Sequence, residues 1–233
     1  MNKIKLILFL LIFHIETSAQ TVLLGMDSKS VGEINERGQN LKKFSHAYFR
    51  LGFLASKDNA GARIIYGNSV NLGLGVRKKY KISPIYSIGV DAELQYTDYK
   101  LKQINGKILP DTVINNISGR LDYSSLGLGF FNRFNVDPNR GNFIGSFIDL
   151  GMMGEFHFSI RSISKNKMPD ETILKSVVKN LQYTNNTSVK IFARLGLGHF
   201  SIYGSYRLTY QFVTSSIYPE LPRFILGMEL GMF

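Results

Sequence analysis

The sequence contains no cysteine, no tryptophan and only six prolines, and charged residues make up only 19% of its 233 positions. Without cysteine, disulfide bonds cannot stabilise the chain, so an exported protein of this composition needs a closed hydrogen-bond network or a large core. After the first segment, no apolar run approaches the ~20 residues of a membrane helix. This absence leaves a membrane barrel open, because barrel strands of about ten residues give a much weaker hydropathy signal.

The first residues have the three-part layout of a secretory signal peptide. Lys3 and Lys5 precede an apolar core over Leu6–Ile15, and small residues follow up to Ala19. The apolar core is too short to span a bilayer as a helix. We therefore expect export and cleavage after Ala19.

Eight strand-length runs then alternate apolar residues with glycine or polar residues. A period of two indicates a β-strand, because successive side chains point to opposite faces. In the run around Leu126-Gly127-Leu128-Gly129-Phe130, for example, one face is apolar and the other carries glycine. The runs lie near residues 44–54, 70–77, 88–95, 126–131, 143–160, 189–196, 202–210 and 224–231.

The connections between these runs alternate between short turns and long loops. Short turns are expected near residues 81–84, 137–141 and 198–199, and long loops near 55–67, 99–119, 162–186 and 213–222. This asymmetry is typical of outer-membrane barrels. Aromatic residues on the apolar face gather at both ends of the runs, as two interfacial girdles would place them: Tyr80, Tyr86, Phe134 and Phe200 at one end, and Tyr96, Phe156, Phe158, Tyr210 and Phe212 at the other.

These features predict an all-β protein: an eight-stranded, antiparallel, up-and-down transmembrane β-barrel that follows a cleaved signal peptide. A soluble β-sandwich also alternates, but the glycine-rich polar face and the alternating turn lengths favour a ring closed in lipid. The expected organisation is a signal peptide at 1–19, a periplasmic lead-in at 20–43 and the barrel at 44–233. The expected location is the bacterial outer membrane.

An eight-stranded barrel is only just wide enough for its own side chains. Charges on its inner face therefore have to pair with one another. We expect a salt-bridged plug in the lumen, with an ion pathway as the alternative, formed by Arg50, Arg77, Asp91, Glu93, Arg133, Asp149, Glu155, Lys190, Arg194, Arg207 and Glu229.

The chain resembles the PorT-like outer-membrane β-barrel family of the Bacteroidetes lineage. The resemblance rests on the leader, the run Tyr123–Phe134, the segment Phe147–Gly154 and the aromatic C-terminus. It implies the barrel fold and the outer membrane, and it defines no catalytic residues. A named member of this family belongs to a secretion apparatus, so an accessory role in such an apparatus is one alternative function.

Phe233 is the expected signal for the outer-membrane assembly machinery, but it departs from the usual pattern. Counting back by two from Phe233 gives Gly231 and Glu229 rather than apolar residues. A β-bulge near Gly231 would restore the phase.

The sequence offers little catalytic or metal-binding chemistry. His46, His157 and His199 lie on different runs, so no close spacing of ligands predicts a metal site. His157 and Ser159, two positions apart and therefore on one inward face, could serve a rim enzyme only if a nucleophile, base and oxyanion site converged. We expect no enzyme activity and no cofactor.

The net charge of +11 would suit nucleic acid inside a cell, but export argues against that partner. The expected partners are outer-membrane lipid, the assembly machinery and, as candidates, lipopolysaccharide and other envelope proteins. Lysines in the long loops could contact lipopolysaccharide phosphates or an acidic partner. The expected function is a structural or interaction role with a closed lumen and long extracellular loops, and a narrow channel or transporter is a further alternative.

Overall fold

The computed structural model describes residues 36–55, 63–102, 116–168, 170–213 and 218–233. The predicted signal peptide and most of the predicted lead-in lie outside these ranges. The described residues contain no helix that is long and apolar enough to cross a membrane. They form strands β1 (Lys43–Ala55), β2 (Val70–Lys81), β3 (Tyr86–Leu101), β4 (Asn116–Asn135), β5 (Ser146–Lys167), β6 (Ile173–Lys179), β7 (Thr187–Leu197), β8 (Phe200–Arg207) and β9 (Phe224–Met232).

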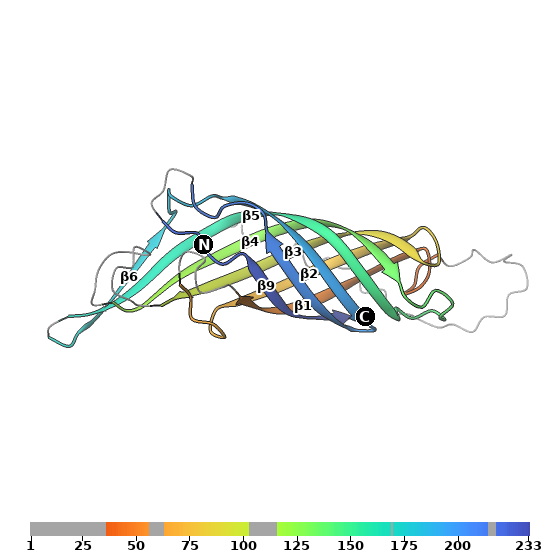
Figure 1. Ribbon diagram of the computed structural model, residues 1–233, viewed down its shortest axis with the longest axis horizontal. Helices are drawn as coiled ribbons and strands as arrows, with labels where there is room; N and C mark the ends of the chain where they lie inside the picture. Colours follow the sequence, from red (N-terminus) through yellow and green to blue (C-terminus); the bar gives the residue numbers. More distant parts are fainter. Residues whose placement is uncertain (1–35, 56–62, 103–115, 169, 214–217) are drawn as a thin grey trace, which may run out of the picture. The chain divides into compact units, whose positions relative to one another are not determined.

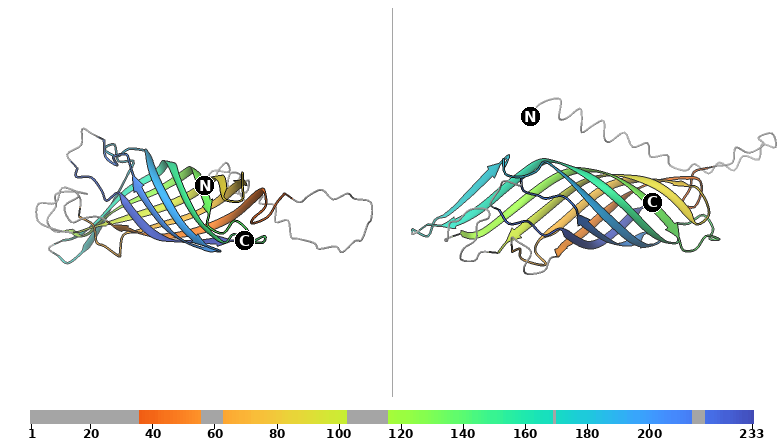
Figure 2. Two further views of the ribbon diagram at one scale, coloured as in Figure 1. Left: turned by 45° about the vertical axis from the view of Figure 1, so that its right-hand side comes forward. Right: turned by 45° about the horizontal axis from the view of Figure 1, so that its top comes forward.

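Eight of these strands close into a ring of antiparallel pairs. The hydrogen-bonded order is β1, β2, β3, β4, β5, β7, β8 and β9, and β9 pairs back to β1. Among the described strands, β6 pairs with the far end of β5 alone, and together they project beyond the ring (Figures 1 and 2). The predicted eight-stranded antiparallel barrel is confirmed. A closed ring leaves no open sheet edge, as a strand structure in lipid requires.

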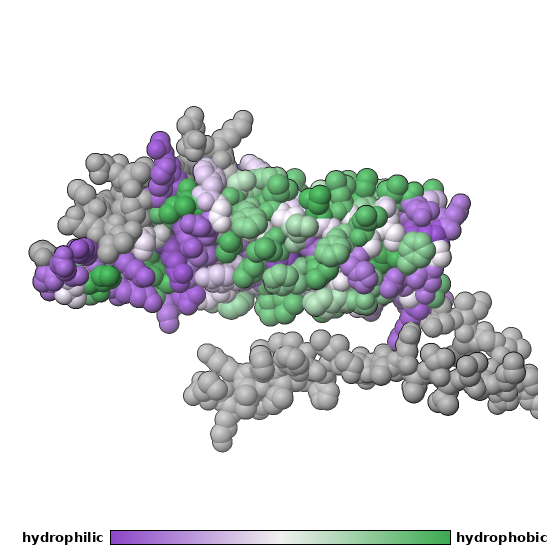
Figure 3. All heavy atoms as spheres, turned by 90° about the horizontal axis from the view of Figure 1, so that it is seen from below, coloured by the Kyte–Doolittle hydropathy of each residue, from purple (hydrophilic) through white to green (hydrophobic). Residues whose placement is uncertain are grey.

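The polarity of the barrel is the reverse of that of a water-soluble protein. Leu128 and Leu150 point outward and are 65% and 50% exposed, whereas Arg133 and Asp149 point inward and are 1% and 0% exposed. On the face in Figure 3, a band of apolar side chains lies between two polar zones. We call this band the apolar belt. It marks the part of the outer surface that water would solvate poorly.

Glycines on the inner face make room for large side chains from neighbouring strands. A Cβ at Gly89 would lie 2.2 Å from the ring of Phe131, and one at Gly196 would lie 2.1 Å from the ring of Phe147. Both distances are too short for any side chain to be accommodated without a shift. The repeated glycines of the sequence therefore provide space for the aromatic filling of the lumen.

Several strands are longer than predicted, because their polarity reverses beyond the apolar belt. The predicted loop 99–119 includes the ends of β3 and β4, and the predicted loop 162–186 includes the end of β5 and all of β6. In β4, Leu121 and Tyr123 are buried inside the barrel, while Arg120 and Asp122 lie on the other face. This is the ordinary pattern of a strand in water, with apolar residues inward. A pattern of outward apolar residues therefore predicts these strands as shorter than they are.

The residues just before β1 are tied to the short-turn end of the barrel. Asn40 donates to the carbonyls of Arg140 and Gly141, at 2.9 and 3.0 Å, and Lys79 donates to the carbonyl of Gln39 at 2.6 Å. Further out, the hydrogen bond from Lys42 lowers the pKa of the Glu36 carboxyl. The described end of the lead-in is thus packed onto β2 and the β4–β5 connection.

Replacing Gly227 by alanine should destabilise the barrel. Gly227 lies opposite Gly52 where the last strand meets the first, and a Cβ there would lie 2.2 Å from the carbonyl oxygen of Leu51. Backbone atoms cannot move aside cheaply, so we expect a loss of about 1–3 kcal/mol in unfolding free energy. Urea unfolding of the refolded protein, followed by circular dichroism, measures this loss.

Gly154→Ala is the matched control, because a Cβ at Gly154 has no atom within 4 Å. We expect its unfolding midpoint to match that of the unmodified protein. Equal effects of the two substitutions would contradict the close approach of β9 to β1.

Candidate functional site

The predicted lumen residues come from every strand of the ring and lie on its inner face. Ten of the eleven are buried, and the side chain of Glu155 is only 9% exposed. By strand they are Arg50 in β1, Arg77 in β2, Asp91 and Glu93 in β3, Arg133 in β4, Asp149 and Glu155 in β5, Lys190 and Arg194 in β7, Arg207 in β8, and Glu229 in β9.

Three arginines and three carboxylates form the central cluster of the lumen. Arg194 in β7 joins the neighbouring strand β5 to β3 across the lumen, because its guanidinium lies 3.3 Å from Asp149 and 2.8 Å from Asp91. Arg77 contacts Asp91 at 2.9 Å and Glu229 at 2.7 Å. Asp91 and Glu229 are therefore each within ion-pair distance of both Arg77 and Arg194. The cluster links β2, β3, β4, β5, β7 and β9.

The third arginine, Arg133, makes the best-aligned pair. Its Nε and Nη2 donate to the two oxygens of Asp149 at 2.7 and 2.8 Å, a bidentate geometry. Its guanidinium also lies 3.5 Å from the ring centroid of Phe147. At the centre of the cluster, the ring of Phe131 lies 4.8 Å from the guanidinium of Arg194. Aromatic faces thus complete the environment of the buried cations.

A second ion pair lies beside the central cluster. Arg50 in β1 pairs with Glu93 in β3, and the hydroxyl of Tyr48 donates to the other Glu93 oxygen at 2.7 Å. The guanidinium of Arg50 lies 4.2 Å from the ring centroid of Tyr203. Both oxygens of this carboxylate are therefore occupied inside the barrel.

A third ion pair lies nearer the long-loop end. The ammonium of Lys190 lies 2.5 Å from Glu155 and donates to Gln95 at 2.9 Å. The hydroxyl of Ser188 donates to Glu155 at 2.7 Å. Gln95 and Ser188 were not among the predicted residues, although their inward position in the alternation places them on the same face.

Arg207 pairs with a carboxylate that the sequence did not reveal. Its guanidinium lies 2.6 Å from Glu220, and it also donates to Gln211 and, at 3.1 Å, to the carbonyl of Leu221. Glu220 lies in the connection between β8 and β9, outside any alternating run. With Glu220 included, six cations face six carboxylates in this network.

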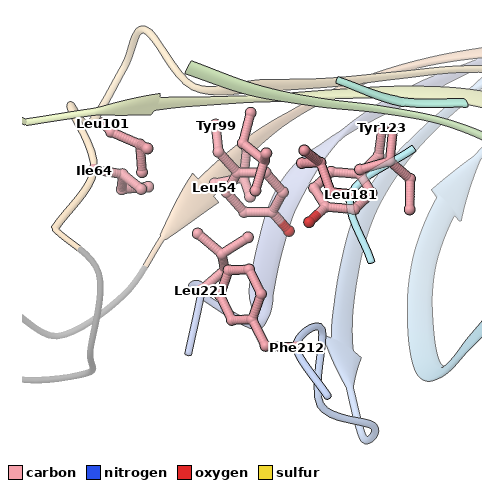
Figure 4. Close-up of a cluster of buried hydrophobic side chains, with 10 residues drawn as sticks. Leu54, Ile64, Tyr99, Leu101, Tyr123, Leu181, Phe212 and Leu221 are labelled. Carbon is pink, nitrogen blue, oxygen red and sulfur yellow. The ribbon is translucent and has the colours of Figure 1, made fainter. Parts of the chain in front are cut away.

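Apolar side chains close the lumen at the long-loop end. Leu54, Tyr99, Tyr123, Phe212 and Leu221 belong to one buried cluster and point toward one another (Figure 4). Phe212 is 3% exposed, so its predicted place in an interfacial girdle is wrong. It packs inward because the segment after β8 folds over this end of the barrel.

A small polar cavity lies between this cluster and the ion pairs. Its volume is about 30 Å³, room for roughly two water molecules. His157, Tyr123 and Arg207 are among the residues that line it. Within the described part of the chain, the ring nitrogens of His157 and the hydroxyl of Tyr123 have no hydrogen-bond partner. The cavity therefore suits water molecules that satisfy these groups.

The predicted pairing of His157 with Ser159 on one inward face is wrong. Ser125 lies opposite His157, but Ser124 lies opposite Ser159, so one extra residue of β5 interrupts the register. This β-bulge reverses the phase, and Ser159 lies on the outer face. Across the described ranges, no group of three His, Cys, Asp or Glu residues is placed to hold a metal ion.

Phe233, the predicted assembly signal, follows the last paired residue of β9. β9 pairs with β1 in continuous register from Phe224 to Met232, so no bulge near Gly231 restores the phase in the described strands. The ring of Phe233 instead stacks on His199, with centroids 4.0 Å apart, and meets the edges of Phe44 and His46. An aromatic cluster at the short-turn end thus holds the C-terminus.

No family model and no curated protein matches the chain. Among solved structures, the chain is similar to the crystal structure of Ail, the attachment invasion locus protein of Yersinia pestis, in complex with the heparin analogue sucrose octasulfate. The identity is 9% and the TM-score is 0.36, over 82% of this chain and 98% of that chain. The assignment of a closed barrel rests on the strand pairing described above.

Asp149→Asn should destabilise the barrel strongly. The substitution leaves the buried guanidinium of Arg133 without a charged partner, and removing one member of a buried pair costs about 3–5 kcal/mol. The double variant Asp149→Asn with Arg133→Met should recover part of this loss, because the unpaired cation is gone. Unfolding free energies from urea titration measure both effects.

Glu36→Gln is the control, because it breaks an exposed pair with Lys42 at 3.0 Å. An exposed pair contributes about 0–1 kcal/mol. The comparison also needs the single variant Arg133→Met. If the losses in unfolding free energy from Asp149→Asn and Arg133→Met simply added in the double variant, the two residues would not be coupled as their geometry requires.

Proposed function

We propose that this protein is an outer-membrane β-barrel with a structural or interaction role. Its lumen is closed by paired charges, and its working surface is the long-loop end. The observation that carries the proposal is the reversed polarity of the ring: charged residues fill the inside and apolar residues cover the outside. The resemblance to the PorT-like family, and the part in a secretion apparatus that it implies, stay predictions.

The apolar belt supports insertion in a bilayer. Leu74, Leu128, Met152 and Met228 are each more than half exposed on the outside of the ring. Apolar surface in water costs about 25 cal/mol per Å², and monomeric soluble proteins rarely expose continuous patches above a few hundred Å². Acyl chains remove this cost. The barrel solution also satisfies the backbone groups of every strand in the ring without water.

The contents of the lumen favour a plug over a channel. Arg77, Arg133 and Arg194 are each at most 2% exposed and are held between carboxylates and aromatic rings. The apolar cluster around Tyr99 and Leu221 closes the long-loop side. Moving an ion through this region would require breaking several buried pairs, each of which costs several kcal/mol to separate.

A single tryptophan reports insertion directly, because the chain contains none. In Leu128→Trp the probe lies on the apolar belt, so lipids brominated in the middle of their acyl chains should quench most of its fluorescence. In Phe143→Trp the probe lies in the β4–β5 connection, at a site that is also exposed, and quenching should be weak. The measurement is the fluorescence ratio in brominated and ordinary vesicles.

Equal quenching at the two positions, or no stable association with vesicles, would contradict a membrane-spanning barrel. Density-gradient fractionation of the envelope then tests which membrane holds the protein. Recovery with the inner membrane alone would contradict the outer-membrane location.

We expect no steady conductance when the refolded protein is inserted in planar bilayers. The central ion pairs and the apolar cluster leave a cavity of only about 30 Å³ between them. Single-channel recording at symmetrical high salt measures this. Reproducible open currents would contradict the closed lumen and favour the channel alternative, while leaving the membrane assignment intact.

A further inference from the structure

Beyond the apolar belt, strands β3 to β6 continue as a sheet whose outer face is rich in cations. Four of them surround one hollow of about 310 Å³: Lys100 in β3, Arg120 in β4, Lys165 in β5 and Lys175 in β6. The other lining residues are Ile65, Leu101, Ser118, Gly119 and Ile163, so no carboxylate lines the hollow. We call these four cations the outer basic site.

The strand register places these cations side by side. Lys100 lies directly opposite Arg120 in the β3–β4 pair, and Lys165 lies directly opposite Lys175 in the β5–β6 pair. Like charges directly opposite each other destabilise a sheet. The Lys165–Lys175 pair at the hollow therefore carries an electrostatic cost that a bound anion would remove.

Described carboxylates account for only one of the four cations. Arg120 lies 3.8 Å from Asp98 and 3.5 Å from Asp122. Among the residues that the structure describes, no carboxylate lies within ion-pair distance of Lys100, Lys165 or Lys175. Three ammonium groups around the hollow thus keep donors for a ligand, and each ammonium has three.

Protection of a sheet edge does not account for this arrangement. Lysine on an edge strand discourages pairing with other chains, which would explain Lys175 on β6. Lys100 and Arg120, however, lie on β3 and β4, which have neighbours on both sides. Their position over the hollow needs another reason.

The height of the site matches the polar layer of a bilayer. Lys100 follows Tyr96, at the edge of the apolar belt, by four residues on the same outer face. At ~3.3 Å per residue and a strand tilt of ~40°, this places Lys100 about 10 Å further along the barrel axis. The headgroup layer begins at the edge of the hydrocarbon and extends several Å outward. Long lysine side chains can reach back toward that layer.

We propose that the outer basic site binds the phosphate groups of a phosphorylated glycolipid in the adjacent leaflet. The inference rests on the proposed insertion of the barrel in the outer membrane. A phosphate ester offers several strong acceptor oxygens and close to two negative charges, which suits clustered ammonium and guanidinium donors. The acyl chains of the same lipid would lie along the apolar belt below the site. The site thus fixes a boundary lipid at the long-loop end.

The test is the binding of diphosphoryl lipid A to the full barrel in zwitterionic micelles, measured by native mass spectrometry. The triple variant K100Q/K165Q/K175Q should bind the lipid roughly tenfold or more weakly than the unmodified protein. Each cation near an anionic lipid surface contributes to the binding affinity, and this variant removes three of them. Dephosphorylated lipid A should bind the unmodified protein as weakly as the variant binds the diphosphoryl form.

The matched control is K42Q/K43Q/K78Q, which removes the same charge from exposed lysines near the short-turn end. Its affinity should stay within about twofold of the unmodified value, since these lysines line no part of the hollow. A loss as large as that of the first triple variant would mean diffuse attraction and would overturn the proposal. Unchanged binding by K100Q/K165Q/K175Q would also overturn it.

Inorganic phosphate separates a lipid from a free anion as the ligand. Displacement of lipid A by an equal concentration of inorganic phosphate would show that the site binds the free anion and would overturn the lipid proposal. Gel electrophoresis identifies any variant that fails to fold, because its unboiled sample migrates at the position of the boiled, unfolded protein. Failure of the parent proposal gives a different result, because the unmodified protein would then not insert in vesicles at all.

Discussion

The enclosure of charged side chains within a ring of eight strands is the constraint on which the rest of this structure depends. A buried ion costs several kcal/mol unless an opposite charge and hydrogen bonds compensate it. The strand register supplies this compensation. A slip by one residue in β4 would turn Arg133 into the apolar belt and Leu128 into the lumen. The charge network therefore specifies the register as much as the belt does.

Charged pairs alone would leave gaps in the lumen. Inward glycines leave space for aromatic rings from neighbouring strands, and these rings fill the gaps. At Gly89 and Gly196 the missing side chains leave space for the rings of Phe131 and Phe147. Those rings in turn lie against the guanidinium groups of the central cluster. The glycine repeat and the inward arginines thus belong to one packing arrangement. The glycine repeat in the sequence therefore serves the packing of the buried ion pairs in the lumen.

The alternation of the sequence was enough to predict the ring and the inward side of each charge, but not the partners. Arg194 meets Asp91 from 103 residues away, across the lumen, and such pairs depend on the stagger of strands around the ring. Glu220 lies in a connection without alternating residues, so no pattern indicates that it pairs with Arg207. The bulge that turns Ser159 outward adds a single residue to an otherwise regular alternation, which the sequence pattern does not reveal. Loop lengths were overestimated because strand polarity reverses outside the belt.

The balance inside the barrel determines what the outside displays. Six cations match six carboxylates in the lumen network, so the network adds no net charge, and the formal charge of +11 lies elsewhere in the chain. In β3 and β4 the outer face beyond the apolar belt carries Asp98 and Asp122 first, and then Lys100 and Arg120. In a barrel inserted as proposed, the positive charge outside the lumen network would act on anionic groups that lie within about a Debye length of it.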